Sequence, residues 1–282
     1  MLNTTKNTKQ GVHRVCRKDT FMKNTKIISI ANQKGGVGKT TTALNLAAAL
    51  KQKGKNVLLV DFDPQANLSD YLGYTHNVTK ATISTMMSNL VNGTRMNPAH
   101  SIYTSAEGLE YIASDIQLSS AEIFLINAMS RETVLKRILQ ADELEKYEYI
   151  IIDCLPSLGI LMINALAASD YVIAPVQAQK FALDGISLFL NAFKMVKTNL
   201  NPGLQLSGIL LTMYDNTNMA KAVHETLLEQ FPDLLFETTI SRSVEATNST
   251  YEQKSLVSRK SSKLGKQYLD LAEEFLNRGV RK

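Results

Sequence analysis

A glycine-rich segment has the residue types and spacing of a phosphate-binding loop. It reads Lys34-Gly35-Gly36-Val37-Gly38-Lys39-Thr40-Thr41. Its glycines let consecutive backbone N–H groups curl around phosphate oxygens, and the start of a following helix adds its dipole and free donors. In such a loop Lys39 reaches the β- and γ-phosphates, and the Thr40 hydroxyl is placed to ligate Mg²⁺. The motif therefore predicts a nucleoside triphosphate bound with Mg²⁺.

Three aspartates follow apolar runs elsewhere in the chain. Asp61 and Asp63 lie in the sequence DFDPQ, and Asp153 closes the run YIIID. The carboxyl ends of parallel strands meet at one edge of a sheet, so these carboxylates should converge on the crevice that holds the phosphate loop. Phosphoryl transfer needs mainly positioning and charge, which such a site supplies.

Lys34 is a second lysine, at the start of the loop. Lys39 already serves the nucleotide of its own subunit, so the extra cation could reach a nucleotide held by a facing subunit. The alternative is an ordinary solvated lysine.

Short apolar runs that could position these residues alternate with helix-length amphipathic stretches. The runs cover 26–31, 56–61, 149–153, 171–176 and 206–213, and helices are predicted over about 39–53 and 262–278. Continuous apolar strands separated by helices indicate a parallel sheet buried on both faces. We therefore predict an α/β fold with a doubly wound, mostly parallel sheet flanked by helices.

Composition and charge narrow the class of protein. The chain has 282 residues, with 44% hydrophobic and 20% charged residues, as in ordinary globular proteins. It contains no apolar run of 18 residues and no apolar segment at the N-terminus, so neither a membrane span nor secretion is predicted. Cys16 and Cys154 make no disulfide framework or metal set, which favours the cytosol.

The positive charge is concentrated at the start of the chain. Residues 1–26 carry seven Lys or Arg against one Asp, a net +6, and the whole chain carries +5, so residues 27–282 sum to −1. We predict a flexible basic tail over 1–24, followed by a single P-loop ATPase domain over 25–282. The sequence leaves three explanations of this tail open. It is a disordered extension, or translation truly starts at Met22, or the tail is an arm that contacts DNA phosphates. Any DNA-binding face on the body must be a local patch.

The motifs resemble one family of nucleotide-binding proteins. The segments ANQKGGVGKTTTALNLA, LLVDFDPQANLS, YIIIDCLPSLGILMINALAASD, APVQAQKFALDG and GILLTMYD follow the order and approximate spacing of ParA/Soj partition ATPases, of the ParA/MinD deviant Walker type. The likeness covers residues 26–275 and is nearest to versions on Gram-positive plasmids and integrative elements. It implies an ATP- and Mg²⁺-dependent homodimer that binds double-stranded DNA non-specifically and hydrolyses ATP weakly. It further implies stimulation by a ParB-like centromere-binding protein, a cytoplasmic, nucleoid-associated location and no membrane partner.

The resemblance also implies roles for individual residues. Lys34, Lys39 and Asp63 are the catalytic residues, with Lys34 crossing the dimer interface onto the partner's phosphates and Asp63 positioning the attacking water. Thr40, Asp63 and Asp153 are the residues around Mg²⁺. The nucleotide-binding positions are Lys34, Gly35, Gly36, Val37, Gly38, Lys39, Thr40, Thr41, Asp153, Met213, Ser241 and Ser243. Cys154 is interpreted as a packing residue without a redox role.

The sequence departs from the family where base and DNA contacts are expected. Ser241 and Ser243 replace a Pro and an Asn that line the adenine, and Glu245 stands where a DNA-contacting Arg often sits. The stretch 215–218 also lacks an Arg that many relatives carry. The predicted DNA contacts therefore fall on other cations, namely Arg242, Lys254, Arg259, Lys260 and Lys263. Lys221 and Lys266 are further candidates.

Other functions remain open on the sequence. A basic run is often only a solvated surface. A MinD-like ATPase that acts on membrane or protein cargo would suit the nearly neutral body, but residues 277–282 are too polar for an amphipathic membrane tip. A metabolic or cofactor-assembly ATPase of the same fold is a further alternative. A GTPase is disfavoured because no Asn-Lys-x-Asp motif is present.

Overall fold

The described part of the chain is built around one twisted sheet. The computed structural model describes residues 25–75, 80–179 and 182–279, so the predicted tail 1–24, with Cys16 and Met22, lies outside the described residues. Seven strands pair in the order β3-β4-β2-β5-β1-β6-β7. Their bounds are β1 (Lys26–Ile30), β2 (Val57–Phe62), β3 (Ile102–Thr104), β4 (Glu110–Ile112), β5 (Tyr149–Cys154), β6 (Tyr171–Gln177) and β7 (Gln205–Thr212). All neighbouring pairs are parallel except β3 with β4, which confirms the predicted fold class.

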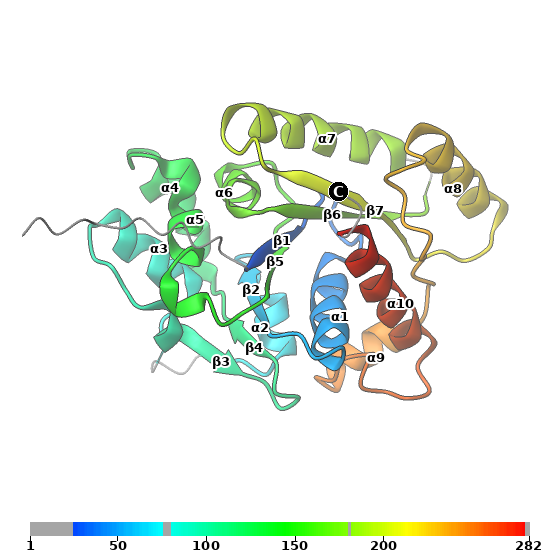
Figure 1. Cartoon of the computed structure of the whole chain (residues 1–282), viewed down its shortest axis with the longest axis horizontal. Coiled ribbons are helices and arrows are strands. Elements are labelled where there is room, and N and C mark those ends of the chain that lie inside the picture. The colour runs from blue at the N-terminus through cyan, green and yellow to red at the C-terminus, as the bar shows by residue number, and fades with distance from the viewer. Residues whose placement is uncertain (1–24, 76–79, 180–181, 280–282) are drawn as a thin grey trace, which may run out of the picture.

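Helices cover both faces of this sheet (Figure 1). The helices are α1 (Lys39–Gln52), α2 (Asn67–Tyr71), α3 (Ile83–Val91), α4 (Ala121–Leu125), α5 (Val134–Leu139), α6 (Ile160–Ala168), α7 (Ala182–Asn199), α8 (Asn218–Gln230), α9 (Glu245–Tyr251) and α10 (Lys263–Arg278). Short 3-10 turns are η1 (Pro98–Ser101), η2 (Ile116–Ser120), η3 (Arg131–Thr133) and η4 (Asp142–Leu144). Helices α6 and α7 lie on one face, and α1 and α10 lie on the other. Among the described helices, none combines the length and apolarity needed to cross a bilayer.

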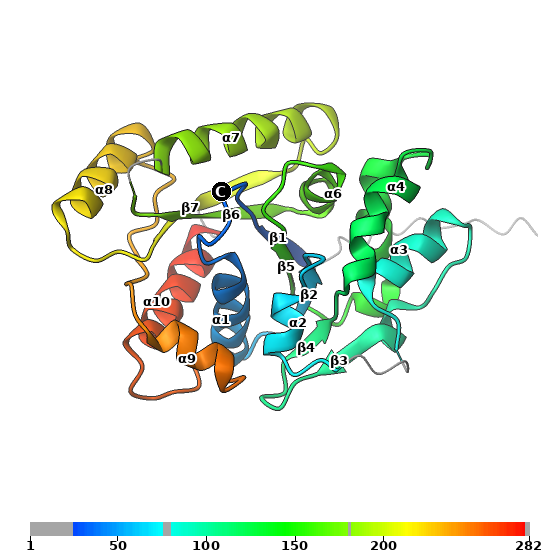
Figure 2. The same ribbon diagram turned by 180° about the vertical axis from the view of Figure 1, so that it is seen from behind.

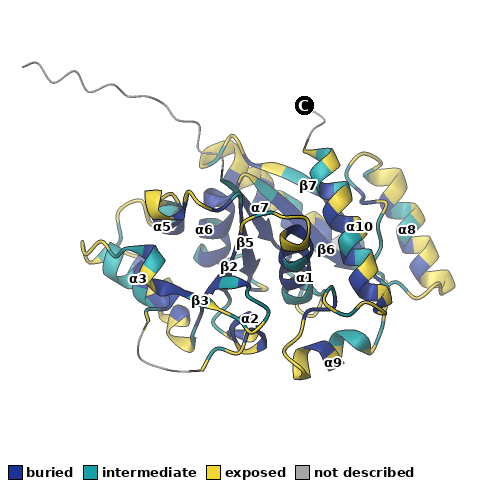
Figure 3. Cartoon of the chain, turned by 60° about the horizontal axis from the view of Figure 1, so that its bottom comes forward, coloured by how far each residue is buried: buried dark blue, intermediate teal, exposed yellow. Residues whose placement is uncertain are grey.

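The apolar runs form strands because both of their faces are buried. Every residue of β2 and β5 is buried, including Asp61 and Asp153, each next to last in its strand. Two hydrophobic clusters result, one on each side of the sheet: one contains Leu161 of α6, and the other contains Leu44 of α1 and Tyr268 of α10. Figure 3 shows the buried residues concentrated in the strands, with exposed stripes on the outer sides of α8 and α10.

The predicted elements agree with the structure to within about a residue. Helix α1 ends at Gln52 rather than at residue 53, and β7 ends at Thr212 rather than at Met213. Met213 has φ 52°, a left-handed conformation that stops the strand. The antiparallel edge strand β3 was not predicted from the sequence.

Gly265 lets the segment before α10 pack against that helix. A Cβ atom at Gly265 would overlap the backbone carbonyl oxygen of Leu256 and lie 2.8 Å from its carbonyl carbon. Leu256 is fully buried, so neither backbone has room to move away without opening the core.

Replacing Gly265 by Ala should lower the free energy of unfolding by about 1–3 kcal/mol, because the added methyl overpacks a backbone contact. Urea denaturation of the full chain measures this change. Gly185→Ala is the matched control, since no atom lies within 4 Å of a Cβ at Gly185 in helix α7. The control should be neutral or slightly more stable, because Ala is a better helix former than Gly. Equal stability of Gly265→Ala and the wild type would contradict the packing described.

Candidate functional site

The predicted phosphate loop joins the end of β1 to the start of α1, at the carboxyl edge of the sheet. Gly36 and Gly38 have φ of 70° and 84°, which residues with a Cβ rarely adopt. Gly38 is the N-cap of α1, no side chain caps the helix, and its first turn contains no acid. The free N–H groups and the positive end of the helix dipole are therefore left for an anion.

Two polar residues that the sequence analysis did not single out hold this loop in shape. Asn32 Nδ2 donates to the carbonyl oxygen of Pro175 at 2.7 Å, and Asn32 Oδ1 accepts from the Lys34 N–H at 3.0 Å. The Thr212 hydroxyl donates to the Val37 carbonyl oxygen at 2.9 Å. The loop is thus fastened to β6 and β7. Polar residues at the ends of apolar strands are the only sequence signal for these contacts.

The two lysines of the loop occupy different surroundings. Lys39 is buried and its Nζ donates to the Lys34 carbonyl oxygen at 2.9 Å. Burial lowers the pKa of Lys39, and the nearby Asp153 and Asp63 oppose this shift. Lys34 is half-buried and its Nζ lies 3.2 Å from Gln179 Oε1, a weak contact that leaves the ammonium near solvent. Lys39 therefore faces into the site, and Lys34 lies at its rim.

Asp61 and Asp63 follow one another at the end of β2 but differ in burial. Asp61 is fully buried and accepts hydrogen bonds from the Ser69 N–H at 2.8 Å and the Ser69 hydroxyl at 2.7 Å. Burial raises the pKa of Asp61 to about 6 despite these donors. Asp63 is half-buried, and its Oδ1 accepts from the Gln65 N–H at 2.9 Å. Asp63 is thus the more accessible of the two predicted carboxylates.

Asp153 is the least satisfied polar group at the site. It pairs in register with Asp61 on the neighbouring strand, and both of its carboxylate oxygens are buried without a hydrogen-bond partner among the described residues. Burial, and then the charge of Asp61, raise the pKa of Asp153 well above its usual value, although Thr40 and Lys39 are near enough to oppose the shift. The next residue, Cys154, is also buried, and burial raises the pKa of its thiol to about 12, so it stays protonated.

This carboxylate suits a magnesium ion shared with a bound nucleotide. An unpaired buried carboxylate next to a threonine hydroxyl provides the hard oxygen donors that Mg²⁺ prefers. No group of three or more His, Cys, Asp or Glu side chains that could hold a metal occurs in the described ranges. Thr40 and Asp153 are the residues here that would hold such an ion together with the nucleotide.

Two of the three predicted base-side residues, Met213 and Ser241, come together beyond β7. Tyr214 forms a parallel β-bridge with Ser241. The Tyr214 N–H donates to the Ile240 carbonyl oxygen, and the Arg242 N–H donates to the Tyr214 carbonyl oxygen, both at 3.0 Å. Met213 and Ser241 are thus adjacent. Helix α10 fixes Ser241, because Gln267 accepts from the Ser241 N–H at 3.0 Å and donates to its hydroxyl at 2.8 Å.

The predicted DNA contacts lie around the start of α10 and on the segment before α9. We call residues 252–262, between α9 and α10, the basic loop. Lys254 and Lys260 of this loop are exposed, as are Arg242 and Lys263. Arg259 is partly buried, and its Nη2 lies 2.9 Å from Glu252 Oε2, so its charge is largely matched within the loop.

The Glu245 carboxylate is turned toward the start of α10. Its Oε2 accepts a hydrogen bond of 2.5 Å from the Ser262 hydroxyl, which in turn accepts from the Gly265 N–H at 2.9 Å as the N-cap of α10. The residue that replaces an expected arginine therefore braces the start of α10.

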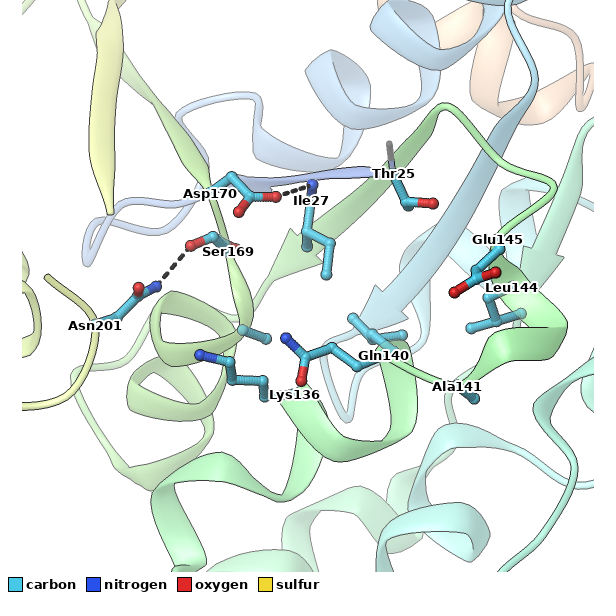
Figure 4. A pocket seen from close by; sticks show the side chains of 12 residues that line it. Thr25, Ile27, Lys136, Gln140, Ala141, Leu144, Glu145, Ser169, Asp170 and Asn201 are labelled. Atoms are coloured by element: carbon cyan, nitrogen blue, oxygen red, sulfur yellow. Dashed lines mark hydrogen bonds between the residues drawn. The ribbon is translucent and has the colours of Figure 1, made fainter. Parts of the chain in front are cut away.

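Two hollows open at the opposite, amino-terminal edge of the sheet, away from the predicted site. The smaller, of about 130 Å³, is drawn in Figure 4; there the Asp170 carboxylate accepts from the Ile27 N–H at 2.8 Å and Asn201 donates to the Ser169 carbonyl oxygen. The larger, of about 1340 Å³, runs along the end of α10 past Arg278. Neither contains a residue predicted to bind nucleotide.

The chain is similar to known proteins over most of its length. A family model described as an AAA domain matches residues 25–206. The sporulation initiation inhibitor protein Soj of Bacillus subtilis (strain 168) is 44% identical over 260 residues, which cover 90% of this chain and 99% of that protein. The chromosome-partitioning ATPase Soj of Treponema pallidum (strain Nichols) is 42% identical, with 78% of this chain and 84% of that protein covered.

A solved structure shares the fold and holds a nucleotide. The cobyrinic acid a,c-diamide synthase of Mycobacterium smegmatis, crystallised with ADP and magnesium, superposes with a TM-score of 0.77 at 31% identity. The match covers 92% of this chain and 97% of that one. One fold thus serves proteins with different names, and the higher sequence identity lies with the partition ATPases.

Replacing Asp153 by Asn should stabilise the nucleotide-free chain by about 1–3 kcal/mol at pH 8, because it removes a buried charge that lacks a hydrogen-bond partner. A carboxyl with a raised folded-state pKa stabilises the fold fully below its unfolded pKa, and that stability is lost as the pH rises through the folded pKa. For Asp61 this loss of stability runs from about pH 4 to about pH 6, and for Asp153 it also begins at about pH 4. The gain from Asp153→Asn should therefore grow with pH.

Urea denaturation at pH 5 and pH 8, with and without Mg²⁺ and ATP, measures both effects. The wild type should gain stability when Mg²⁺ and ATP are added, by about 2.7 kcal/mol at a hundredfold excess over Kd. The variant should gain much less. If Asp153→Asn is less stable than the wild type at pH 8 without nucleotide, the Asp153 carboxylate does not destabilise the fold as described.

Proposed function

This chain belongs to the ParA/Soj family of partition ATPases, and on that premise we propose that its ATP-bound form is a homodimer that holds duplex DNA without sequence preference. The chain is a DNA-segregation ATPase that uses ATP and Mg²⁺, as the family does. The observation that carries the nucleotide part of this proposal is the uncapped start of α1, with Lys39, beside the buried carboxylate of Asp153. These groups are complementary to phosphates and to a magnesium ion, respectively.

Each residue of the site has a proposed part in this cycle. The N–H groups of residues 35–41 and Lys39 bind the phosphates of their own subunit, and Thr40 and Asp153 hold the metal. Mg²⁺, when bound, neutralises phosphate charge that develops during transfer. Asp63, the accessible carboxylate, orients the attacking water. Met213, Ser241 and Ser243 line the base.

Lys34 is proposed to complete the site of the facing subunit. Its ammonium lies at the rim, and its contact with Gln179 is a single exposed hydrogen bond to an uncharged amide oxygen. A phosphate of the partner's nucleotide would be a stronger acceptor than a side-chain amide, because both groups would be charged. Two such lysines, one from each subunit, would make dimerisation depend on ATP.

The DNA face is proposed to be the basic loop with its flanking cations. Lys254, Lys260 and Lys263 are exposed and carry no ion pair in the described structure. A dimer presents each cation twice, which suits binding to phosphates of any sequence. A ParB-like centromere-binding protein is proposed as the partner that stimulates hydrolysis, and the nucleoid as the place of action. Both proposals come from the partition relatives.

Lys34→Ala should bind ATP as a monomer but fail to form the dimer, because the cross-subunit charge is lost. Asp63→Ala should accumulate the ATP dimer, because hydrolysis is lost while binding groups remain. Analytical gel filtration with Mg²⁺ and ATP distinguishes the two. Lys197→Ala, an exposed lysine in the last turn of α7, is the control and should behave as the wild type. A dimer from Lys34→Ala, or none from Asp63→Ala, would refute these roles.

Unrelated duplex DNA should bind with ATP but not with ADP, and the affinity should fall steeply with salt. Changing Lys254 and Lys260 together to Ala should reduce the slope of log affinity against log salt by about one for each phosphate contact removed. The control removes Lys194 and Lys197 from α7, two exposed lysines outside the proposed face. Equal slopes for the two variants would place DNA elsewhere, and binding only to anionic vesicles would favour a MinD-like role.

A further inference from the structure

The basic loop is fastened by its backbone to the two helices that leave the nucleotide site. The Leu256 N–H donates to Asn45 Oδ1 of α1 at 2.7 Å. The Tyr71 hydroxyl of α2 donates to Ser249 Oγ of α9, just before the loop, and also lies 3.2 Å from the Lys254 carbonyl oxygen. Asn45 and Leu256 are fully buried, and Tyr71 is 3% exposed. The loop's backbone is therefore fixed, while the side chains of Lys254 and Lys260 remain in solvent.

The contact on α1 begins one turn beyond the phosphate-binding end of that helix. Asn45 Nδ2 donates to the Thr41 carbonyl oxygen at 2.8 Å, so the Asn45 amide bridges the first turns of α1 and the loop. Asn45 lies six positions after Lys39, a rise of about 9 Å along the helix. A small shift of the start of α1 would thus reach Leu256 through fewer than two helical turns.

The contact on α2 begins at the buried acid of the site. Ser69 holds Asp61 with two hydrogen bonds, and Tyr71 follows two residues later on the same short helix. Gln253 adds a second link, because its Nε2 donates to the Asp70 carbonyl oxygen at 2.9 Å. Figure 2 shows α2 beside α1, with α9 beneath α1 and the loop following it.

We propose that the basic loop senses the nucleotide through these two contacts, and that Tyr71 and Asn45 are positioning residues for DNA binding. The proposal rests on the proposed DNA-binding role of Lys254 and Lys260. Occupancy of the phosphate loop and of the Asp61–Asp63 turn fixes α1 and α2, and these helices fix the backbone that carries the lysines. ATP and DNA therefore raise each other's affinity by the same factor.

Tyr71→Phe is the sharpest test, because it removes one hydroxyl and keeps the buried ring. Hydrogen exchange of the full chain is measured without nucleotide and with Mg²⁺ and a non-hydrolysable ATP analogue, in the absence of DNA. In the wild type the analogue should slow exchange both at residues 35–42 and at 254–258. In Tyr71→Phe the slowing at 35–42 should persist and that at 254–258 should fall about tenfold, the change expected for one buried hydrogen bond.

Tyr147→Phe is the matched control, because Tyr147 is as buried as Tyr71 but packs in the hydrophobic cluster on the other face of the sheet. It should keep the slowing at both segments. Asn45→Ala is the second variant and should lose the slowing at 254–258 as Tyr71→Phe does. Unchanged slowing at 254–258 in both Tyr71→Phe and Asn45→Ala would overturn the transmission through α1 and α2.

DNA binding then separates this inference from the proposed function. The ratio of duplex affinity with the analogue to that with ADP should fall about tenfold in Tyr71→Phe, while the gel-filtration mass with the analogue stays that of a dimer. A loop with a purely architectural role would weaken DNA binding in both nucleotide states and leave the ratio unchanged. Lost slowing at 254–258 with an unchanged ratio would overturn the assignment of DNA contacts to this loop.

Discussion

The unbalanced charge between two neighbouring strands is the constraint on which the nucleotide site depends. Parallel pairing of β2 with β5 brings Asp61 and Asp153 level with each other, inside a sheet that is buried on both faces. Asp61 is compensated by Ser69, but Asp153 has no such donor among the described residues. The fold therefore maintains a buried carboxylate that a bound cation or a proton would stabilise. Like many binding sites, it gives up stability for affinity.

The same principle governs the start of α1. Helices α8 and α10 are capped by Thr217 and Ser262, whereas α1 begins at Gly38 without a side-chain cap. Helices α3, α6 and α9 also lack a side-chain cap, so what distinguishes α1 is that its uncapped start adjoins the left-handed glycines and the lysine of the loop. Lys39 donates to the loop's own carbonyl oxygen at Lys34, so the lysine and the loop are held together.

The sequence predicts the frame of this structure well because the frame depends on local pattern. Continuous apolar runs mark β1, β2, β5, β6 and β7 to within about a residue, and the glycines with Lys39 mark the loop between strand and helix. The edge strand β3 has three residues and pairs antiparallel, so it carries little periodicity. The braces from Asn32 and Thr212 were missed because each joins segments far apart in the chain. Glu245 shows the limit of matching by position, since its identity did not reveal that it turns inward to Ser262.

The basic loop alternates between residues that are held and residues that are free. Ser255, Leu256 and Ser262 are buried anchors, and Lys254 and Lys260 stand outside them in solvent. Evolution can therefore exchange the outer side chains without disturbing the anchors or the ATPase. The net charge of this surface can thus change one side chain at a time, while the buried backbone contacts that hold the loop stay the same.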